Sequence, residues 1–360
     1  MQAQEYFIGL MSGTSLDAVD ACLVDLSDGI RLVHASNLAI PDTLRRQSRD
    51  LNLPADNDLQ RSLILDRQWG YLLAEAAIKV IKESGVDKAS IRAIGSHGQT
   101  VRHEPGGKHA YSLQIGDPNT LCEQTGITVV ADFRRRDIAA GGQGAPLAPA
   151  FHQAVFASQD EYRAIINIGG MANITQLGNA IAGFDSGPGN VLMDSWIQHQ
   201  LQMDYDRNGD WAASGKVLQT LLKTLLDDPY FAKPPPKSTG REYFGLHWLT
   251  PFLDGSEKPE DIQATLAELT AHSICQALQP DTDAVYVCGG GAFNHHLLKR
   301  MATISKLPVK TTAELGIPPQ WLEAIAFAWL AKQTLQQCPG NIPAVTGALG
   351  GRILGAIYQA

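Results

Sequence analysis

Three short turns rich in glycine could bring backbone N–H groups close to an anion such as a phosphate. Each turn follows an apolar segment that is typical of a strand buried on both faces. The turns are Ser12-Gly13-Thr14-Ser15-Leu16-Asp17, Gly169-Gly170 and Gly289-Gly290-Gly291. A predicted helix begins after the third turn, and a helix N-terminus favours a nucleotide phosphate. Any one turn alone could equally serve only the geometry of a hairpin, but the recurrence of the arrangement favours ligand binding.

The carboxylate best placed for chemistry is Asp185. It stands among glycines, at the end of a predicted strand that runs from Ala180 to Phe184 and before an amphipathic helix. An acid in this position can reach a cleft and act as a general base. The alternative role is that of a helix N-cap, but Asn190 lies closer to the helical pattern and suits that role better. We therefore predict that Asp185 is the general base.

Two histidines and a glutamate are further candidates. His97 follows a short strand that ends at Ser96, and ligands often bind at the C-terminal ends of parallel strands. His97 and His103 are either ligands or acid/base groups, or residues that only fix a loop. Glu323 lies near the start of the apolar helix Trp321 to Gln336, as either a partner of the helix dipole or a pocket residue. The sequence does not choose between these alternatives.

The sharpest basic run is Arg134-Arg135-Arg136, which follows a predicted strand from Ile127 to Phe133. A strand end suits a ligand carboxylate or an ion pair better than a surface that tracks DNA. The 360 residues carry a formal net charge of −8, which argues against nucleic acid or an anionic membrane as the main partner.

Composition favours a folded, soluble chain with two domains, since 360 residues exceed what one core usually serves and 44% are hydrophobic. The five cysteines are scattered without a C-x-x-C pair, which is typical of reduced residues in a cytosolic protein. The N-terminus shows no secretion signal, and no apolar run reaches the roughly 18 residues of a membrane span. We therefore expect a cytoplasmic protein without a membrane partner.

The elements that must position these residues form two similar halves. The first half opens with an apolar hairpin, a third strand from Ile30 to Ile40 and a helix from Leu59 to Glu83. The second half opens in the same way, with strands Tyr162 to Ile168, Met171 to Leu177 and Ala180 to Phe184. The pattern predicts a duplicated fold with a cleft between the copies. A glycine cluster at 141–144 marks the first domain boundary, and further helices are predicted at 147–157, 211–226, 260–278 and 295–303.

The chain has no G-x-x-x-x-G-K-[ST] loop, no H-R-D kinase set and no strand followed by G-x-G-x-x-G. If it handles ATP, it must do so through separate glycine turns on two domains. That combination is the pattern of the actin-like, sugar-kinase and Hsp70 ATPase superfamily.

Eight stretches in one order along nearly the whole chain closely resemble the anhydro-N-acetylmuramic acid kinase family of bacterial cell-wall recycling. They are GLMSGTSLDAVD (9–20), IGSHGQTVRHEP (94–105), ADFRRRDIAAGGQGAP (131–146), NIGGMANIT (167–175), GFDSGPGNVLMD (183–194), PKSTGREYF (236–244), VCGGGAFN (287–294) and the helix at 321–330.

The resemblance implies an α/β fold of two duplicated, ribonuclease H-like domains of the actin-like ATPase type, with ATP and substrate in the interdomain cleft. We expect the first domain at residues 1–140 plus about 341–360, and the second at 141–340. It implies a kinase that uses ATP, Mg²⁺ and water to convert 1,6-anhydro-N-acetylmuramic acid into N-acetylmuramic acid 6-phosphate, in peptidoglycan recycling. It also suggests a homodimer.

The resemblance implies that the catalytic aspartate is Asp185, that residues 13–20 meet the ATP phosphates and that residues 289–291 meet the adenosine side. The expected ATP-binding residues are Gly13, Thr14, Ser15, Leu16, Asp17, Ala18, Val19, Asp20, Gly169, Gly170, Gly289, Gly290 and Gly291. For the substrate we expect His97, Arg134 and Glu323, with the arginine run meeting the lactyl carboxylate.

Two departures from the family patterns bear on this prediction. The family usually has glycine where this chain has Ala18, and Met11 stands where the superfamily often has the acid of its phosphate turn. The metal ligands therefore stay open among Asp17, Asp20 and Asp185. The rival functions are a kinase for another sugar and a non-catalytic nucleotide-binding scaffold.

Overall fold

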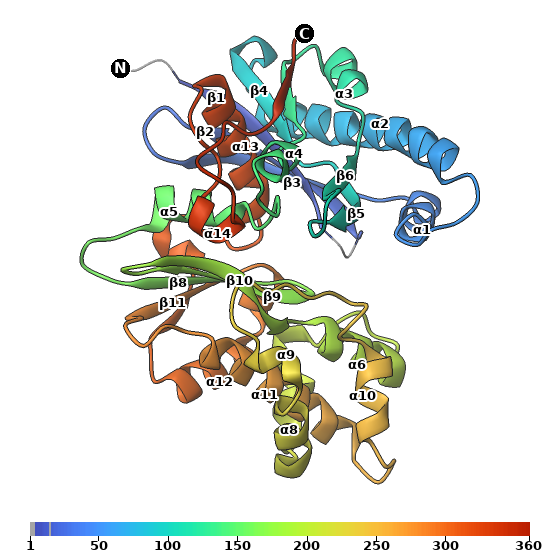
Figure 1. Cartoon of the computed structure of the whole chain (residues 1–360), viewed down its shortest axis with the longest axis vertical. Coiled ribbons are helices and arrows are strands. Elements are labelled where there is room, and N and C mark those ends of the chain that lie inside the picture. The colour runs from blue at the N-terminus through green and yellow to red at the C-terminus, as the bar shows by residue number, and fades with distance from the viewer. Residues whose placement is uncertain (1–3, 14–15) are drawn as a thin grey trace. The chain divides into compact units, whose positions relative to one another are not determined.

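The computed structural model describes residues 4–13 and 16–360, which form two compact units (Figure 1). Unit 1 comprises the residues up to Val155 together with Trp321–Ala360, and unit 2 is Phe156–Gln320. Unit 2 therefore begins at residue 156, later than the expected 141, and ends at residue 320, earlier than the expected 340. The helix α13 (Leu322–Leu335), expected in the second domain, belongs to unit 1 because it packs on the sheet of that unit.

Unit 1 is built on a six-stranded mixed sheet with the order β13-β7-β4-β1-β2-β3. Strands β1 and β2 are antiparallel, as are β2 and β3, whereas β1, β4 and β7 run parallel. A separate hairpin is formed by β5 and β6. The strands are β1 (Tyr6–Ser12), β2 (Ala18–Asp25), β3 (Arg31–Ala39), β4 (Ile91–Ser96), β5 (Gln99–Glu104), β6 (Tyr111–Ile115), β7 (Val129–Ala131) and β13 (Ala356–Tyr358).

The helices of unit 1 include α2, which ends before Gly85 with the positive φ of a C-terminal cap, as the sequence predicts. The helices are α1 (Asp42–Asp50), α2 (Asp58–Ser84), α3 (Pro118–Thr125), α4 (Arg135–Ala139), α5 (Ala148–Phe156), α13 and α14 (Pro343–Thr346).

Unit 2 has a five-stranded sheet with the order β10-β9-β8-β11-β12. Its strands pair as those of unit 1 do. Strands β8, β9 and β10 form an antiparallel meander, and β8, β11 and β12 are parallel. The strands are β8 (Arg163–Ile168), β9 (Met171–Leu177), β10 (Ile181–Pro188), β11 (Ala284–Cys288) and β12 (Val309–Thr311). The helices are α6 (Val191–Leu201), α7 (Asp210–Ser214), α8 (Gln219–Leu226), α9 (Pro229–Ala232), α10 (Leu246–Leu249), α11 (Pro259–Gln276) and α12 (His295–Ser305).

The two sheets share one topology. When the strands of each sheet are numbered along the chain, both sheets read 3-2-1-4-5, with the second strand antiparallel to its neighbours and β13 added at one edge of the sheet of unit 1. This is the ribonuclease H-like arrangement, present twice. The predicted duplicated α/β fold is confirmed.

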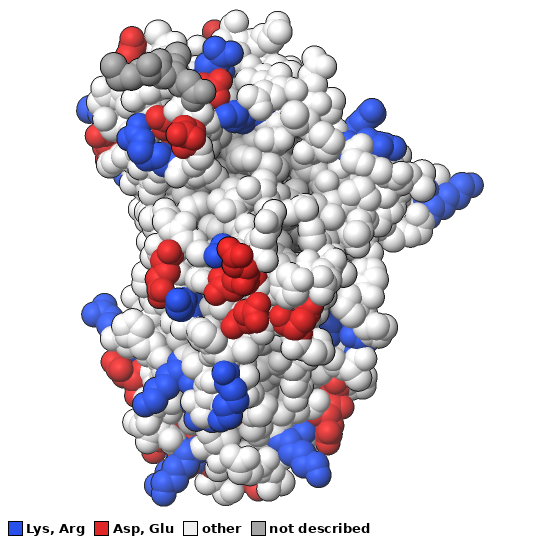
Figure 2. Space-filling view, turned by 90° about the vertical axis from the view of Figure 1, so that its left-hand side faces the viewer, with Lys and Arg blue, Asp and Glu red and all other residues white. Residues whose placement is uncertain are grey.

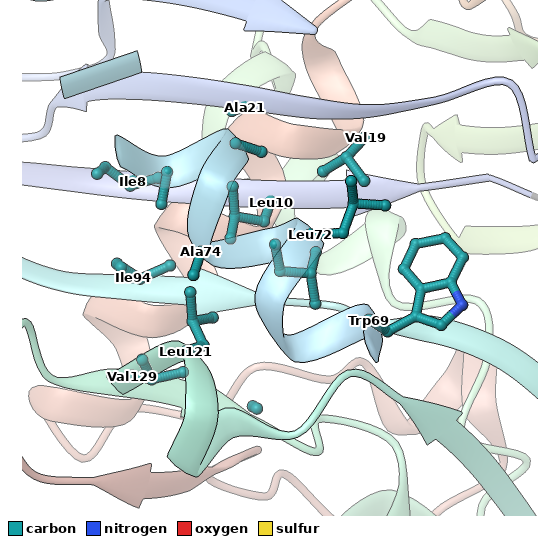
Figure 3. Close-up of a cluster of buried hydrophobic side chains, with 14 of the residues drawn as sticks. Ile8, Leu10, Val19, Ala21, Trp69, Leu72, Ala74, Ile94, Leu121 and Val129 are labelled. Atoms are coloured by element: carbon teal, nitrogen blue, oxygen red, sulfur yellow. The ribbon is translucent and has the colours of Figure 1, made fainter. Parts of the chain in front are cut away.

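In unit 1, α2 and α13 both pack on the six-stranded sheet. Successive side chains of each strand point to opposite faces of that sheet. The core beneath α2 is drawn in Figure 3, where Leu10 and Val19 of adjacent strands lie near Leu72 and Trp69 of the helix. These side chains are buried, and burial of this kind contributes roughly 1.5–3 kcal/mol for each large apolar side chain.

Close packing of α13 depends on two glycines that pair across β1 and β4, Gly9 and Gly95. A Cβ at Gly9 would overlap the carbonyl oxygen of Ala324, and one at Gly95 would overlap that of Phe327. The helix backbone therefore lies directly against the sheet, which is why α13 is part of unit 1.

Some sequence predictions need correction. The single helix predicted at 211–226 is two helices, α7 and α8, because Gly215 is extended and presses against the carbonyl of Glu260. The strand predicted at 127–133 shortens to β7, so Arg134 lies before α4 instead of at a strand end.

The charged side chains on the face drawn in Figure 2 are of both signs and interspersed, without an extended basic stripe on that face. Within residues 4–13 and 16–360, each helix is too short or too polar to cross a lipid bilayer. All five cysteines are free thiols.

Candidate active site

Asp185 lies in β10, and donors from other segments hold its carboxylate. Its Oδ1 accepts from Nδ2 of Asn173, which is its cross-strand partner on β9. Its Oδ2 accepts from the backbone N–H of Thr239 at 3.0 Å. The backbone is fixed as well, since the N–H donates to the carbonyl of Lys237 at 3.1 Å and the carbonyl accepts from the hydroxyl of Tyr230 at 2.8 Å.

The β10–β9 pairing shifts register between Asp185 and Gly187, which marks a β-bulge. Bulges re-aim side chains and are frequent beside active sites. Burial raises the pKa of the Asp185 carboxyl, and the hydrogen bonds from Thr239 and Asn173 offset part of that rise. A raised pKa makes the ionised carboxylate a stronger proton acceptor, which suits a general base.

The two glycine turns of unit 2 meet at the carboxyl ends of the parallel neighbours β8 and β11. The carbonyls of Gly169 and Gly170 accept from the N–H groups of Asn190 at 2.8 Å and Gly189 at 2.9 Å, which tie the β8–β9 turn to the start of α6. Gly289 has a φ of 76°. Carboxyl ends of adjacent parallel strands are where such sheets bind ligands.

The third turn lies directly beside the second. A Cβ at Gly289 would overlap Oδ1 of Asn167, and one at Gly291 would overlap the side chain of Ile168, both at the end of β8. A Cβ at Gly290 would lie 3.6 Å from Nδ2 of Asn190. Glycine is therefore required at 289 and 291, where a Cβ would overlap residues at the end of β8, whereas a Cβ at 290 would make only an ordinary contact.

In unit 1 the β1–β2 turn begins at Gly13, and the predicted ligands Thr14 and Ser15 lie outside the described residues. Leu16 is buried with a φ of 60°, and its N–H donates to the carbonyl of Gly13 at 3.3 Å. Asp17 is exposed. A Cβ added to Gly13 would meet no described atom within 4 Å, so there is space beside the backbone of this glycine.

Ala18 begins β2, pairs with Ala39 and does not have a positive φ. Alanine therefore needs no strained backbone at the position where the family usually has glycine. The side chain of Val19 is fully buried in the core beneath α2, so only its backbone can contact a ligand.

Asp20 lies on the opposite face of β2 from Val19 and near Glu323 of α13. Burial, together with the negative charge of Glu323, raises the pKa of Asp20 to about 7. A hard cation near this carboxylate pair would relieve the repulsion between the two groups. Within residues 4–13 and 16–360, no group of three or more His, Cys, Asp or Glu side chains could hold a metal ion. A magnesium ion at Asp20 would therefore need phosphate or water oxygens as further ligands.

Arg134 immediately precedes α4, and its side chain donates hydrogen bonds to neutral groups. Its Nη2 and Nε donate to Nε2 of His97 at 2.8 and 3.2 Å, and its Nη1 donates to the carbonyl of Gly144 at 2.9 Å. Burial and the positive charge of Arg134 hold the pKa of His97 well below its usual value, so the imidazole is neutral. Burial lowers the pKa of Arg134 to about 10, against the opposing effect of Glu323.

A model of the family described as anhydro-N-acetylmuramic acid kinase matches residues 5–360. The chain belongs to the anhydro-N-acetylmuramic acid kinase family. Proteins of that name from Coxiella burnetii and Shewanella amazonensis are 52% and 51% identical to it, over 99% of this chain and 98% and 100% of their own lengths. The one from Nitrosomonas europaea is 50% identical over 99% of this chain and all of its own length.

For a member of this kinase family, the structure groups the predicted residues into two sets. In unit 2, Gly169, Gly170 and the turn at 289–291 lie together at one sheet edge, and Asp185 lies on a strand of the same sheet. In unit 1, Asp20, Glu323, Arg134 and His97 form a second set through the charge interactions and hydrogen bonds above. His103 hydrogen-bonds outside that set, since its Nδ1 lies 3.0 Å from the hydroxyl of Ser112 and links β5 to β6, but burial and the positive charge of Arg134 lower its pKa to about 4.

Sequence reasoning missed the residues that hold Asp185, which are Asn173, Thr239 and Tyr230. Asn173 could have been found, because a hairpin with the turn at 178–180 places it opposite Asp185. Thr239 and Tyr230 have no such signal, because the segment that carries them reaches Asp185 only through tertiary folding.

Proposed function

We propose that this chain uses ATP and water to convert 1,6-anhydro-N-acetylmuramic acid into N-acetylmuramic acid 6-phosphate and ADP. Membership of the anhydro-N-acetylmuramic acid kinase family supports the substrate and the reaction class. The structural observation that carries the proposal is the buried carboxylate of Asp185, held by Asn173 and Thr239 in a β-bulge.

In the proposed reaction, Asp185 accepts a proton from water as the water oxygen forms a bond to the anomeric carbon. The bond between that carbon and O6 breaks, and O6 attacks the γ-phosphorus of ATP, which releases ADP. One base thus serves two bond changes. Most of the rate acceleration in phosphoryl transfer comes from positioning and charge stabilisation, so the backbone donors of the glycine turns are central to the mechanism.

The nucleotide contacts proposed are the turn at Gly13 and the turns at 169–170 and 289–291. Arg241 joins this set as a cation, because a Cβ on Gly170 would lie 3.6 Å from its Nη2. A guanidinium beside a phosphate-binding turn can stabilise the charge that develops on the transferred group. Asp20 is the protein carboxylate that we propose would hold Mg²⁺, which would supply positive charge to stabilise the phosphates.

The lactyl carboxylate of the sugar is assigned to Arg134. Its hydrogen bonds to described residues go to neutral acceptors, His97 and Gly144, and the Glu323 carboxylate acts on it only through charge, so its hydrogen bonds neutralise none of its positive charge. Glu323 would accept from a sugar hydroxyl or the N-acetyl N–H. A homodimer and a cytoplasmic location, where ATP is abundant, complete the proposal.

The test is incubation with the anhydro sugar and ATP in ¹⁸O-water, followed by mass spectrometry. We expect ¹⁸O at the anomeric hydroxyl and an unlabelled oxygen bridging C6 to phosphorus. Phosphorylation of a different sugar, with the anhydro compound untouched, would replace this proposal with the rival kinase. ATP that is bound but never consumed would indicate a scaffold.

A further inference from the structure

Asp137, in the first turn of α4, is fully buried and accepts three hydrogen bonds from neutral groups. Its Oδ1 accepts from Nδ2 of Asn341 at 2.6 Å and from the hydroxyl of Thr346 at 2.8 Å. Its Oδ2 accepts from the backbone N–H of Gly144 at 2.8 Å. The donors are Asn341 and Thr346, which is the last residue of α14, 204 and 209 positions away, and Gly144 in the loop after α4, so this one side chain joins distant segments.

The same peptide segment also binds Arg134. The N–H of Gly144 donates to Asp137, while its carbonyl accepts from Nη1 of Arg134 at 2.9 Å. The neighbouring N–H of Gln143 donates to the carbonyl of Thr346 at 2.8 Å, which fixes the loop a second time. The position of the Gly144 carbonyl, and with it one edge of the guanidinium, therefore depends on Asp137.

The geometry around Gly144 leaves this loop little freedom to adjust. Gly144 has a φ of 69°, and a Cβ on it would lie 2.9 Å from Cγ1 of Ile138. A Cβ on Gly142 would overlap the carboxylate of Asp137. If the hydrogen bond to the Asp137 carboxylate is lost, the Gly144 peptide loses the contact that orients its N–H, and its carbonyl can turn away from Arg134 while the rest of the loop stays anchored.

We propose that Asp137 is a positioning residue: through Gly144 it sets the direction of the Arg134 guanidinium and thereby the binding of the substrate's carboxylate. The proposal rests on the proposed function in one respect, namely that Arg134 contacts that carboxylate. If the proposal is correct, a change at the buried Asp137 affects the binding of the sugar and leaves the binding of ATP unchanged.

The test is Asp137→Asn, which keeps the shape of the side chain but turns an NH₂ group toward one of the donors. We expect the KM for the anhydro sugar to rise about 10-fold while the KM for ATP stays within about 2-fold, because misplacement of a substrate-positioning group affects that substrate. Combined with Arg134→Ala, the change should add little, since both substitutions would remove the same interaction.

Asp206→Asn is the matched control. Asp206 is also a buried aspartate that accepts from two backbone N–H groups, those of Trp211 and Ala212, and from Nε2 of Gln263, but it lies in unit 2. We expect it to lower the melting temperature as Asp137→Asn does and to leave the KM for the sugar unchanged. If Asp137→Asn does not fold, Thr346→Ala removes a single donor and should raise the same KM about 3-fold.

An unchanged sugar KM in folded Asp137→Asn, or effects that simply add to those of Arg134→Ala, would overturn the proposal. Failure of the proposed function is seen separately, as absence of turnover in the unsubstituted chain. In that event crystal structures decide: the Nη1 of Arg134 should leave the Gly144 carbonyl in Asp137→Asn, and an unmoved guanidinium would refute the positioning role.

Discussion

Replacing Asp185 by asparagine removes the proposed base while preserving the size of the side chain. In the parent, two donors face the carboxylate, Nδ2 of Asn173 and the N–H of Thr239. The asparagine oxygen can accept from only one of them, and its NH₂ group then faces the other. The mismatch should cost about 1–3 kcal/mol of stability.

The effect on turnover should be much larger than the effect on folding. General-base catalysis contributes about 10²–10⁴-fold, so kcat should fall by that factor in Asp185→Asn. Nucleotide affinity should be nearly unchanged, because the proposed phosphate contacts come from the glycine turns. The assay measures ADP release with the anhydro sugar, alongside ATP titration by calorimetry.

The control is Asn173→Ala, which removes a donor but leaves the carboxylate in place. With the lowering influence of Asn173 gone, the pKa of Asp185 should rise further, so this variant should lose activity mainly at low pH. Turnover of Asp185→Asn at the parent rate, with ATP affinity intact, would refute the assignment of the base. Collapse of ATP affinity would instead show that Asp185 serves binding.

Three further results are expected. The acidic limb of kcat/KM should lie above the pH at which an ordinary aspartate titrates, because burial raises the pKa of Asp185 and only its ionised form accepts a proton; a pH-rate profile measures this. Asp20→Asn should stabilise the chain against urea at pH 8 but not at pH 4: the folded pKa of about 7 exceeds the unfolded value near 3.8, so the parent loses stability as pH rises through that window. Equal stabilisation at both pH values would contradict the burial of this acid. Gly95→Ala should cost about 1–3 kcal/mol or more in urea unfolding, because its Cβ would overlap the carbonyl of Phe327, whereas Gly106→Ala, with no atom within 4 Å, should be neutral.

Much of the fold could be predicted from local pattern. Apolar strands, glycine turns and the repeated hairpin of the two halves depend on period and turn chemistry, which act over a few residues. The strand at 171–177 has the predicted bounds, and the one predicted at 162–168 begins one residue later. The helix predicted at 211–226 was wrong because its break at Gly215 is set by contact with Glu260, a residue far along the chain.

In the candidate site, too, some features could be predicted from the sequence and others could not. Asp185 and the glycine turns stand out in the sequence because each is anomalous in its own segment. The pairing of Arg134 with His97, the repulsion between Asp20 and Glu323, and the anchoring of Asp137 by Asn341 and Thr346 do not.

These partners lie tens to hundreds of positions apart, and the local sequence around each one does not indicate its partner. Hydrogen bonds and charge interactions act over a few ångströms of space, and only the folding of the chain brings such groups within that range. The sequence by itself therefore determined which residues have the right chemistry, and the tertiary structure decided which of them act together.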